Sequence, residues 1–316
     1  MVKLISTRRK SPVLTSSSLA CLSRIPTMNL TMGCAHGCLY CYTRSYRAYP
    51  GEGVVSVYTN TLELLRHELQ HRRQKPAAIY LSPASDPFQP VPEVLDIAYR
   101  LLQEIFARGI GLAFLTKGVI PERHMSLLRE NAALIRAQVG VITLDDAVLR
   151  TFEPNAPSAA VRIAQMKQLT ESGIKTQIRI DPILPAVTDD ERTFRELCRS
   201  VREAGVTDLA ASVLFLRPTL TRRLLQASET SATVARCLGA FCQAQRIAIH
   251  AERSSVTALP PREREEVFHR LENVAARYGI TVKRCACKNP DIASGTCSIA
   301  GESHRAGASS EASLFG

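Results

Sequence analysis

The sequence contains no tryptophan, and aromatic residues make up only 5% of its 316 positions. Single-stranded nucleic acids are usually bound by stacking their bases on aromatic rings, so this scarcity does not favour such binding. No apolar run approaches the ~20 residues that a membrane-spanning helix needs. Residues 1–20 are basic and serine-rich without an apolar core, so we do not expect a secretory signal. These absences predict a cytoplasmic protein with no membrane partner, whose cysteines are mostly thiols or metal ligands.

Acidic residues are absent from residues 1–25, although the whole chain has 29 acidic and 40 basic residues and a net charge of +11. A second stretch without acidic residues, 209–228, contains Arg217, Arg222 and Arg223. Basic patches attract the phosphates of nucleic acids. A basic segment and a solvated helix face would give the same pattern, so charge alone leaves a nucleic-acid partner open.

From residue 60 onward, amphipathic helical stretches end at a glycine and are followed by short apolar runs. Such runs are typical of buried parallel strands. Six strands are predicted, near residues 27–32, 77–81, 111–116, 138–143, 176–181 and 208–215. The pattern predicts an α/β fold, a partial (β/α)6 TIM-like barrel over residues 26–216.

The remaining residues fall into three predicted segments. Residues 1–25 form a basic N-terminal segment. Residues 217–304 form a helical, cysteine-containing C-terminal extension, with helices near 230–247 and 260–278 before the short run "GITVKR". The composition of residues 305–316 predicts a disordered tail.

Three of the ten cysteines, Cys34, Cys38 and Cys41, lie in the segment "GCAHGCLYCY" directly after the first predicted strand. In barrels of this kind, chemistry takes place on the loops that follow the strands. A four-iron cluster normally takes four cysteine ligands, so three would leave one iron open to a small molecule. The alternative is a zinc site with His36 as a further ligand, but zinc favours paired C-x2-C halves and no second half lies nearby.

This C-x3-C-x2-C spacing, with an aromatic residue before the last cysteine, resembles the radical S-adenosylmethionine (SAM) superfamily. The motifs "GCAHGCLYCY", "LSPASDPFQP", "LTKG" and "FEPNAPS" follow one another as in its spore photoproduct lyase-like branch, across residues 10–215. The resemblance implies a 4Fe-4S cluster on the three cysteines, with SAM bound to the open iron. It also implies cleavage of SAM to a 5′-deoxyadenosyl radical and an electron donor such as flavodoxin or ferredoxin.

The resemblance further implies contacts to SAM. Ser85 matches a serine that helps to hold the amino group, and Lys117 matches a lysine that pairs with the carboxylate. An ammonium at the carboxyl end of a barrel strand suits a carboxylate on chemical grounds as well. Tyr40 matches the place where the loop meets the adenine. Weaker matches, to ribose and adenine contacts, are Thr143, Ile183 and Leu184.

Two residues are candidates for catalysis. Tyr42 matches a tyrosine implicated in radical relay, although its ring could also pack against the cluster. Asp86 could bind substrate or cap its loop. One departure from the family pattern matters: Pro83 stands where spore photoproduct lyase has its hydrogen-donor cysteine. This argues against thymine-dimer repair by that mechanism.

A second group of cysteines, Cys285, Cys287 and Cys297, lies in "RCACKNPDIASGTC". Two cysteines one residue apart in an extended chain point in opposite directions, so a turn is needed to bring them together. The turn residues of "KNPD" and "SGT" supply one. We expect an auxiliary iron–sulfur cluster; structural zinc, with His304 or Cys21 as fourth ligand, and unligated thiols are the alternatives. We expect Cys198, Cys237 and Cys242 to be small buried hydrophobes.

The sequence therefore predicts a radical SAM enzyme that removes hydrogen from a small-molecule or peptidyl substrate. One alternative is a nucleic-acid modification or repair enzyme, which would bind DNA or RNA in a salt-sensitive way. Another is a zinc-stabilised nucleic-acid-binding protein, which would contain no iron.

Overall fold

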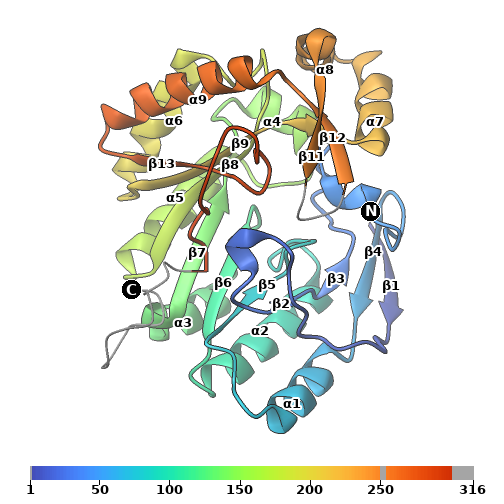
Figure 1. Ribbon diagram of the computed structural model, residues 1–316. Helices are drawn as coiled ribbons and strands as arrows, with labels where there is room; N and C mark the ends of the chain where they lie inside the picture. The colour runs from blue at the N-terminus through green and yellow to red at the C-terminus, as the bar shows by residue number, and fades with distance from the viewer. Residues whose placement is uncertain (1, 250–253, 301–316) are drawn as a thin grey trace.

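The computed structural model describes residues 2–249 and 254–300 (Figure 1). Its central sheet has seven strands in the order β13–β9–β8–β7–β6–β5–β2, and every neighbouring pair is parallel. Their bounds are β2 Thr27–Met28, β5 Ala78–Leu81, β6 Gly111–Thr116, β7 Ile135–Gly140, β8 Lys175–Ile183, β9 Asp208–Val213 and β13 Thr281–Arg284. The edge strands β2 and β13 leave the described sheet open. The predicted α/β fold, a partial TIM-like barrel, is confirmed.

Nine helices are described, and they follow the strands as the repeated pattern predicted. Their bounds are α1 Thr61–His71, α2 Pro92–Phe106, α3 Glu122–Glu130, α4 Asp146–Phe152, α5 Ala159–Glu171, α6 Glu191–Glu203, α7 Pro218–Ser228, α8 Ala232–Gly239 and α9 Pro261–Ala276. The side chains of Asp145, Ser158 and Asp190 accept hydrogen bonds from backbone N–H groups in the first turns of α4, α5 and α6. These caps satisfy donors that a helix leaves unpaired at its start. No described helix has the length and apolar character needed to cross a membrane.

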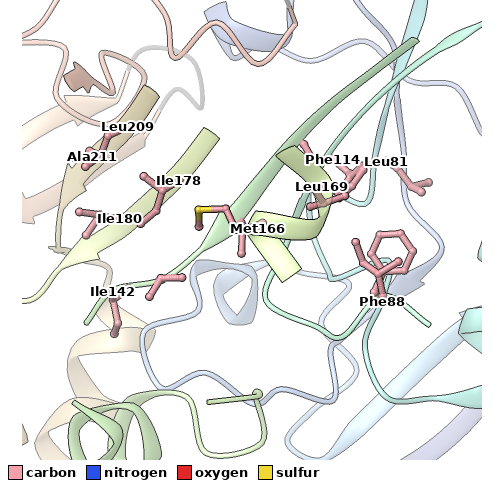
Figure 2. Packing of buried hydrophobic residues seen from close by; sticks show 14 of the residues in the cluster. Leu81, Phe88, Phe114, Ile142, Met166, Leu169, Ile178, Ile180, Leu209 and Ala211 are labelled. Carbon is pink, nitrogen blue, oxygen red and sulfur yellow. The ribbon is translucent and has the colours of Figure 1, made fainter. Parts of the chain in front are cut away.

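Alternate residues of the parallel strands face the helices and form the main core. Figure 2 shows Met166 and Leu169 of α5 packed among Phe114, Ile178 and Ile180 of the neighbouring strands. All five side chains are fully buried. Because side chains alternate along a strand, the intervening residues point to the opposite, inner face of the sheet.

The inner face of the sheet is covered by both ends of the described chain. Tyr80, Ala113 and Ala210 on this face belong to a second apolar cluster with Leu22 and Ile299. Figure 1 shows the N-terminal segment and the segment after β13 side by side on this face. The small side chains at positions 113 and 210 leave room for this packing.

Two smaller sheets were not predicted. One has the order β1–β4–β3, with β1 Lys3–Thr7, β4 Val54–Tyr58 and β3 Thr31–Met32. The other has the order β10–β12–β11, with β10 Phe215–Leu216, β12 Ser254–Ala258 and β11 Gln245–Ile249.

Several predicted bounds need correction. Residues 27–32 divide between β2 and β3, which belong to different sheets, and the fourth predicted strand begins at Ile135 rather than 138. The helix predicted over 230–247 ends earlier, because β11 begins at Gln245.

Cys198 and Cys237 are buried as predicted, but the prediction for Cys242 was wrong, because it is exposed. It follows α8 in a short 3-10 turn at the surface. The tail 305–316 and His304 lie outside the described residues.

Candidate active site

The cysteine loop follows β3 and begins at Gly33, which has a φ of +84°. A Cβ at this position would lie 2.3 Å from the carbonyl oxygen of Val54, so a larger residue would not fit. Two backbone hydrogen bonds then fold the loop, from Gly37 N to Cys34 O and from Cys41 N to Cys38 O, both at 3.3 Å. This folding turns all three cysteines toward one cavity.

Two buried side chains outside the cysteine motif hold this loop. Arg44 donates hydrogen bonds to the carbonyl oxygens of Gly37, at 3.0 Å, and Cys38, at 3.3 Å. Gln89 accepts a hydrogen bond from Ala35 N at 2.8 Å and donates one to Thr31 at 3.0 Å. Neither residue was predicted from the sequence to belong to the site. Arg44 is one of many arginines, and Gln89 is the next-to-last residue of the "LSPASDPFQP" motif, in which Ser85 and Asp86 were the candidates.

Asp86 joins three segments of the site. Its carboxylate lies 3.2 Å from His36 Nε2 in the cysteine loop. It also accepts hydrogen bonds from Thr116 Oγ1 and Lys117 N, both at 2.7 Å, and from Phe88 N at 2.8 Å. Burial opposes ionisation, but these donors, His36 foremost, lower the pKa of Asp86 to about 2. Both carboxylate oxygens are engaged, which favours the alternative in which Asp86 caps its loop.

His36 is held on both sides. Its Nε2 faces Asp86, and its Nδ1 lies 3.3 Å from the carbonyl oxygen of Asn155. With both ring nitrogens occupied, His36 does not offer the free nitrogen that the alternative zinc site required.

Lys117 directly follows β6 and lies near a buried carboxylate, that of Glu153. Its Nζ lies 4.0 Å from Glu153 and 5.5 Å from the centre of the Tyr40 ring. Glu153 also pairs with buried Arg162 and accepts a hydrogen bond from the Tyr40 hydroxyl. Burial alone would lower the pKa of Lys117, but the carboxylate of Glu153 raises it overall, so the side chain is a cation. The motif "FEPNAPS" therefore supplies the buried carboxylate that steadies this lysine.

One cavity gathers half of the predicted site residues. Its volume is about 130 Å³, and its lining includes the three loop cysteines, Ser85 and Lys117. The Oγ atoms of Ser82 and Ser85 are buried and have no hydrogen-bond partner among the described residues. Buried hydroxyls normally have partners, so these two fit a polar group of a bound molecule. The donor set of three thiols, two hydroxyls and an ammonium therefore fits a cluster with SAM beside it.

Two thiols of this cavity, those of Cys34 and Cys38, are held in their neutral form. Burial raises the pKa of Cys38 to about 12, with Lys117 opposing it in part. Burial, with Asp86 nearby, also raises the pKa of Cys34 well above its usual range. Ligation requires thiolates, so binding of a cluster must release protons from these residues.

A second cavity adjoins the first and shares Cys38, Cys41, Tyr42 and Lys117 with it. Its volume is about 120 Å³. The rest of its wall includes Asp181, Phe215, Arg217 and Lys288. Lys288, from the C-terminal extension, donates a hydrogen bond to Asp181 at 2.6 Å.

The other predicted residues lie as follows. Tyr42 borders both cavities, and Tyr40 lines the second. Thr143, Ile183 and Leu184 line neither cavity. Thr143 Oγ1 accepts a hydrogen bond from Asp145 N at 3.1 Å, and Ile183 and Leu184 are fully buried in the core. These contacts support packing roles rather than cofactor contacts.

The second group of cysteines does converge. The Lys288 and Asn289 N–H groups both bond to the carbonyl oxygen of Cys285, which makes the predicted turn. The Cys287 thiol then contacts Cys285 and Cys21. As the side chains stand in the described ranges, no three histidine, cysteine, aspartate or glutamate residues are placed to hold a single metal ion. The auxiliary cluster stays a prediction.

Residues 28–198 match the radical SAM superfamily. This segment contains the cysteine loop, the loop with Ser82 and Ser85, and Lys117, which line the first cavity. It also contains the "FEPNAPS" segment, whose Glu153 lies beside Lys117. The chain belongs to the radical SAM superfamily. The predicted resemblance to this superfamily is therefore confirmed.

Individual relatives cover only part of the chain. An uncharacterized protein of Mycobacterium tuberculosis is 29% identical over 200 residues, which are 60% of this chain and 59% of the relative. The radical SAM Nalpha-GlyT isomerase of Pseudomonas phage M6 is 31% identical over 171 residues, 53% of this chain and 35% of the phage protein. A structure of spore photoproduct lyase with dinucleoside spore photoproduct aligns with a TM-score of 0.68 at 18% identity, over 89% of this chain and 82% of the lyase. At that identity the likeness shows a shared fold.

Proposed function

We propose that this radical SAM protein binds a 4Fe-4S cluster through Cys34, Cys38 and Cys41 and removes hydrogen from a substrate in the second cavity. The observation that carries the proposal is one cavity in which three thiols, two unpartnered hydroxyls and a lysine face the same space. With cluster and SAM bound, one electron would break a carbon–sulfur bond of SAM and give a 5′-deoxyadenosyl radical. Flavodoxin or ferredoxin is the expected class of electron donor.

The residues of the chain would bind and orient SAM. Lys117 offers an ammonium to the SAM carboxylate, and Ser85 offers an unpartnered hydroxyl to the amino group. Glu153 keeps Lys117 charged and in place. Arg44 and Gln89 fix the loop, so the thiols need little reorganisation when the cluster binds.

The second cavity gives the class of substrate. Its wall combines the apolar Phe215 and Leu220 with the cationic Arg217 and Lys288. This mixture suits a small-molecule or peptidyl substrate with an apolar body and a carboxylate or phosphate. Because Cys38, Cys41 and Tyr42 border both cavities, such a substrate would lie next to the bound SAM.

A nucleic-acid substrate is the second candidate. It is supported by the net charge of +11 and by the fold shared with spore photoproduct lyase. The absence of a thiol at Pro83 does not support the repair mechanism of that enzyme. Binding to DNA or RNA with a steep salt dependence would favour this candidate.

The first experiment is anaerobic reconstitution with iron and sulfide, followed by reduction in the presence of SAM. We expect about four irons in the loop site and release of methionine and 5′-deoxyadenosine. Cys38→Ala should abolish both the loop iron and the release, whereas Cys242→Ala, at an exposed position, should change neither. An intact Cys38→Ala activity would refute the proposal.

A further inference from the structure

Four cysteines from opposite ends of the chain meet on the inner face of the sheet. Cys21 lies in a short 3-10 turn, Ala20–Leu22, and its Sγ is 3.6 Å from that of Cys287. The Cys21 thiol also interacts with that of Cys297, and the Cys287 thiol with that of Cys285. The thiols therefore form a continuous chain of contacts in the order Cys297, Cys21, Cys287, Cys285, which we call the four-cysteine site.

We propose that the four-cysteine site binds one tetrahedral divalent metal ion of the zinc class, with Cys21 as the fourth ligand. Zinc binds thiolates at about 2.3 Å in a tetrahedron, which places neighbouring sulfur atoms about 3.8 Å apart. The Cys21–Cys287 separation of 3.6 Å is close to that value. In a four-iron cluster each thiolate binds a different iron, so the sulfur atoms lie farther apart.

Hydrogen-bond donors surround the four-cysteine site. The backbone N–H groups of Cys21 and Ala20 donate to the Cys287 thiol, and the N–H of Ile299 donates to Cys297. Arg179 Nη2 lies 3.3 Å from Cys285 Sγ. Such donors stabilise thiolates and orient them toward a metal.

Binding of the ion would change both the net charge of the site and the positions of its thiols. Four thiolates and a divalent ion carry a net charge of −2, which buried Arg179 beside Cys285 partly offsets. In the described ranges no three ligating side chains yet surround one point. The ion would therefore draw Cys285 and Cys297 inward from contacts that they already make with Cys287 and Cys21.

Such an ion would have a positioning role for the second cavity. It would join the N-terminal segment to the C-terminal extension across the inner face of the sheet. Lys288 directly follows Cys287 and reaches Asp181 at 2.6 Å in the wall of that cavity. The four-cysteine site would thus hold Lys288 beside the substrate. Binding of the metal ion itself does not depend on the radical SAM reaction proposed above.

The test uses the full chain with Cys34→Ala, Cys38→Ala and Cys41→Ala, so that the loop contributes no iron. We expect about one zinc per chain and neither iron nor sulfide after purification without chelators. Adding Cys21→Ser should lower the zinc content at least about tenfold, and adding Cys242→Ser, at an exposed thiol, should leave it unchanged. Iron together with sulfide in the triple variant would show that the four-cysteine site binds an auxiliary iron–sulfur cluster, and would overturn the proposal of a single ion.

A second measurement tests the proposal if the Cys21→Ser variant does not fold, because it does not use that variant. Cobalt(II) is added to the triple variant after its zinc has been removed. We expect the intense visible bands and the sulfur-to-metal charge transfer of tetrahedral cobalt bound to thiolates, at one cobalt per chain. A weak octahedral spectrum, or no uptake, would overturn the proposal. The cleavage of SAM by the parent protein is measured separately, so failure of one proposal does not imply failure of the other.

Discussion

The Tyr42 hydroxyl donates a hydrogen bond to the carbonyl oxygen of Pro83 at 2.7 Å. Burial raises the pKa of this hydroxyl well above its usual value, so it remains a donor. The backbone of Pro83 thus fixes the tyrosine that borders both cavities. The bond anchors the phenol on the wall that the two cavities share, and we expect its role to lie beside the substrate rather than on the cluster.

Tyr42→Phe should therefore leave iron content unchanged and keep release of 5′-deoxyadenosine within about threefold of the parent. Loss of one hydrogen bond should lower the free energy of unfolding by about 1 kcal/mol. Iron analysis, product release and denaturant unfolding check these values, with Tyr99→Phe on α2 as the matched control. Loss of iron in Tyr42→Phe alone would show instead that the ring packs the cluster.

Asp86 should make folding sensitive to acid. Its pKa is about 2 in the folded protein, against 3.8 for a free aspartate. A lowered pKa gives stability that is present above the unfolded value and is lost as the pH falls through the folded value. The difference corresponds to about 2 kcal/mol lost between about pH 5 and pH 2.

Asp86→Asn should remove that part of the pH dependence and destabilise the protein at pH 7 by about 3 kcal/mol, because His36 and several N–H donors lose a charged acceptor. Unfolding in denaturant, measured for both proteins from pH 3 to pH 7, gives the comparison. Asp96→Asn, whose carboxylate is exposed on α2, is the control. Equal slopes for Asp86→Asn and the parent would contradict the argument.

Local sequence patterns were enough to predict the barrel and the cysteine loop. The period of apolar residues and the glycines after helices predicted the strands, and the C-x3-C-x2-C spacing predicted which thiols share a cavity. β1, β4, β11 and β12 were missed because they are short strands in small sheets with mixed exposure. Their pairing depends on contacts distant in sequence, which no local pattern records.

The supporting residues were missed for the same reason. Glu153 is 36 positions from Lys117, so no local pattern links the two. Composition cannot distinguish Arg44, which holds the loop, from the arginines at the surface. Ile183 and Leu184 illustrate the opposite error, because residues near a motif position turned out to be core residues.

Lys117 should contribute to SAM binding rather than to the cluster. Replacing it with Met removes the ammonium and leaves Glu153 paired with Arg162. A charge-assisted hydrogen bond contributes about 1.5–3 kcal/mol, so the Kd for SAM should rise about 10- to 100-fold. Anaerobic equilibrium dialysis with iron analysis measures both quantities. Lys167→Met, at an exposed position on α5, should change neither, and loss of iron in Lys117→Met would point to a structural role.

Gly118 should be intolerant of any side chain, because it lets two loops meet behind Lys117. A Cβ there would lie 2.0 Å from the carbonyl oxygen of Phe88, which is backbone and cannot rotate away. Gly118→Ala should therefore lower the free energy of unfolding by about 3 kcal/mol and weaken SAM binding by displacing Lys117. Gly239→Ala is the matched control, since nothing lies within 4 Å of its Cβ position. In the helical conformation of Gly239, alanine should stabilise the protein by up to about 1 kcal/mol. Changes of opposite sign in the free energy of unfolding would distinguish close packing at Gly118 from the general effect of replacing glycine. Equal changes in the two variants would contradict the expected role of Gly118.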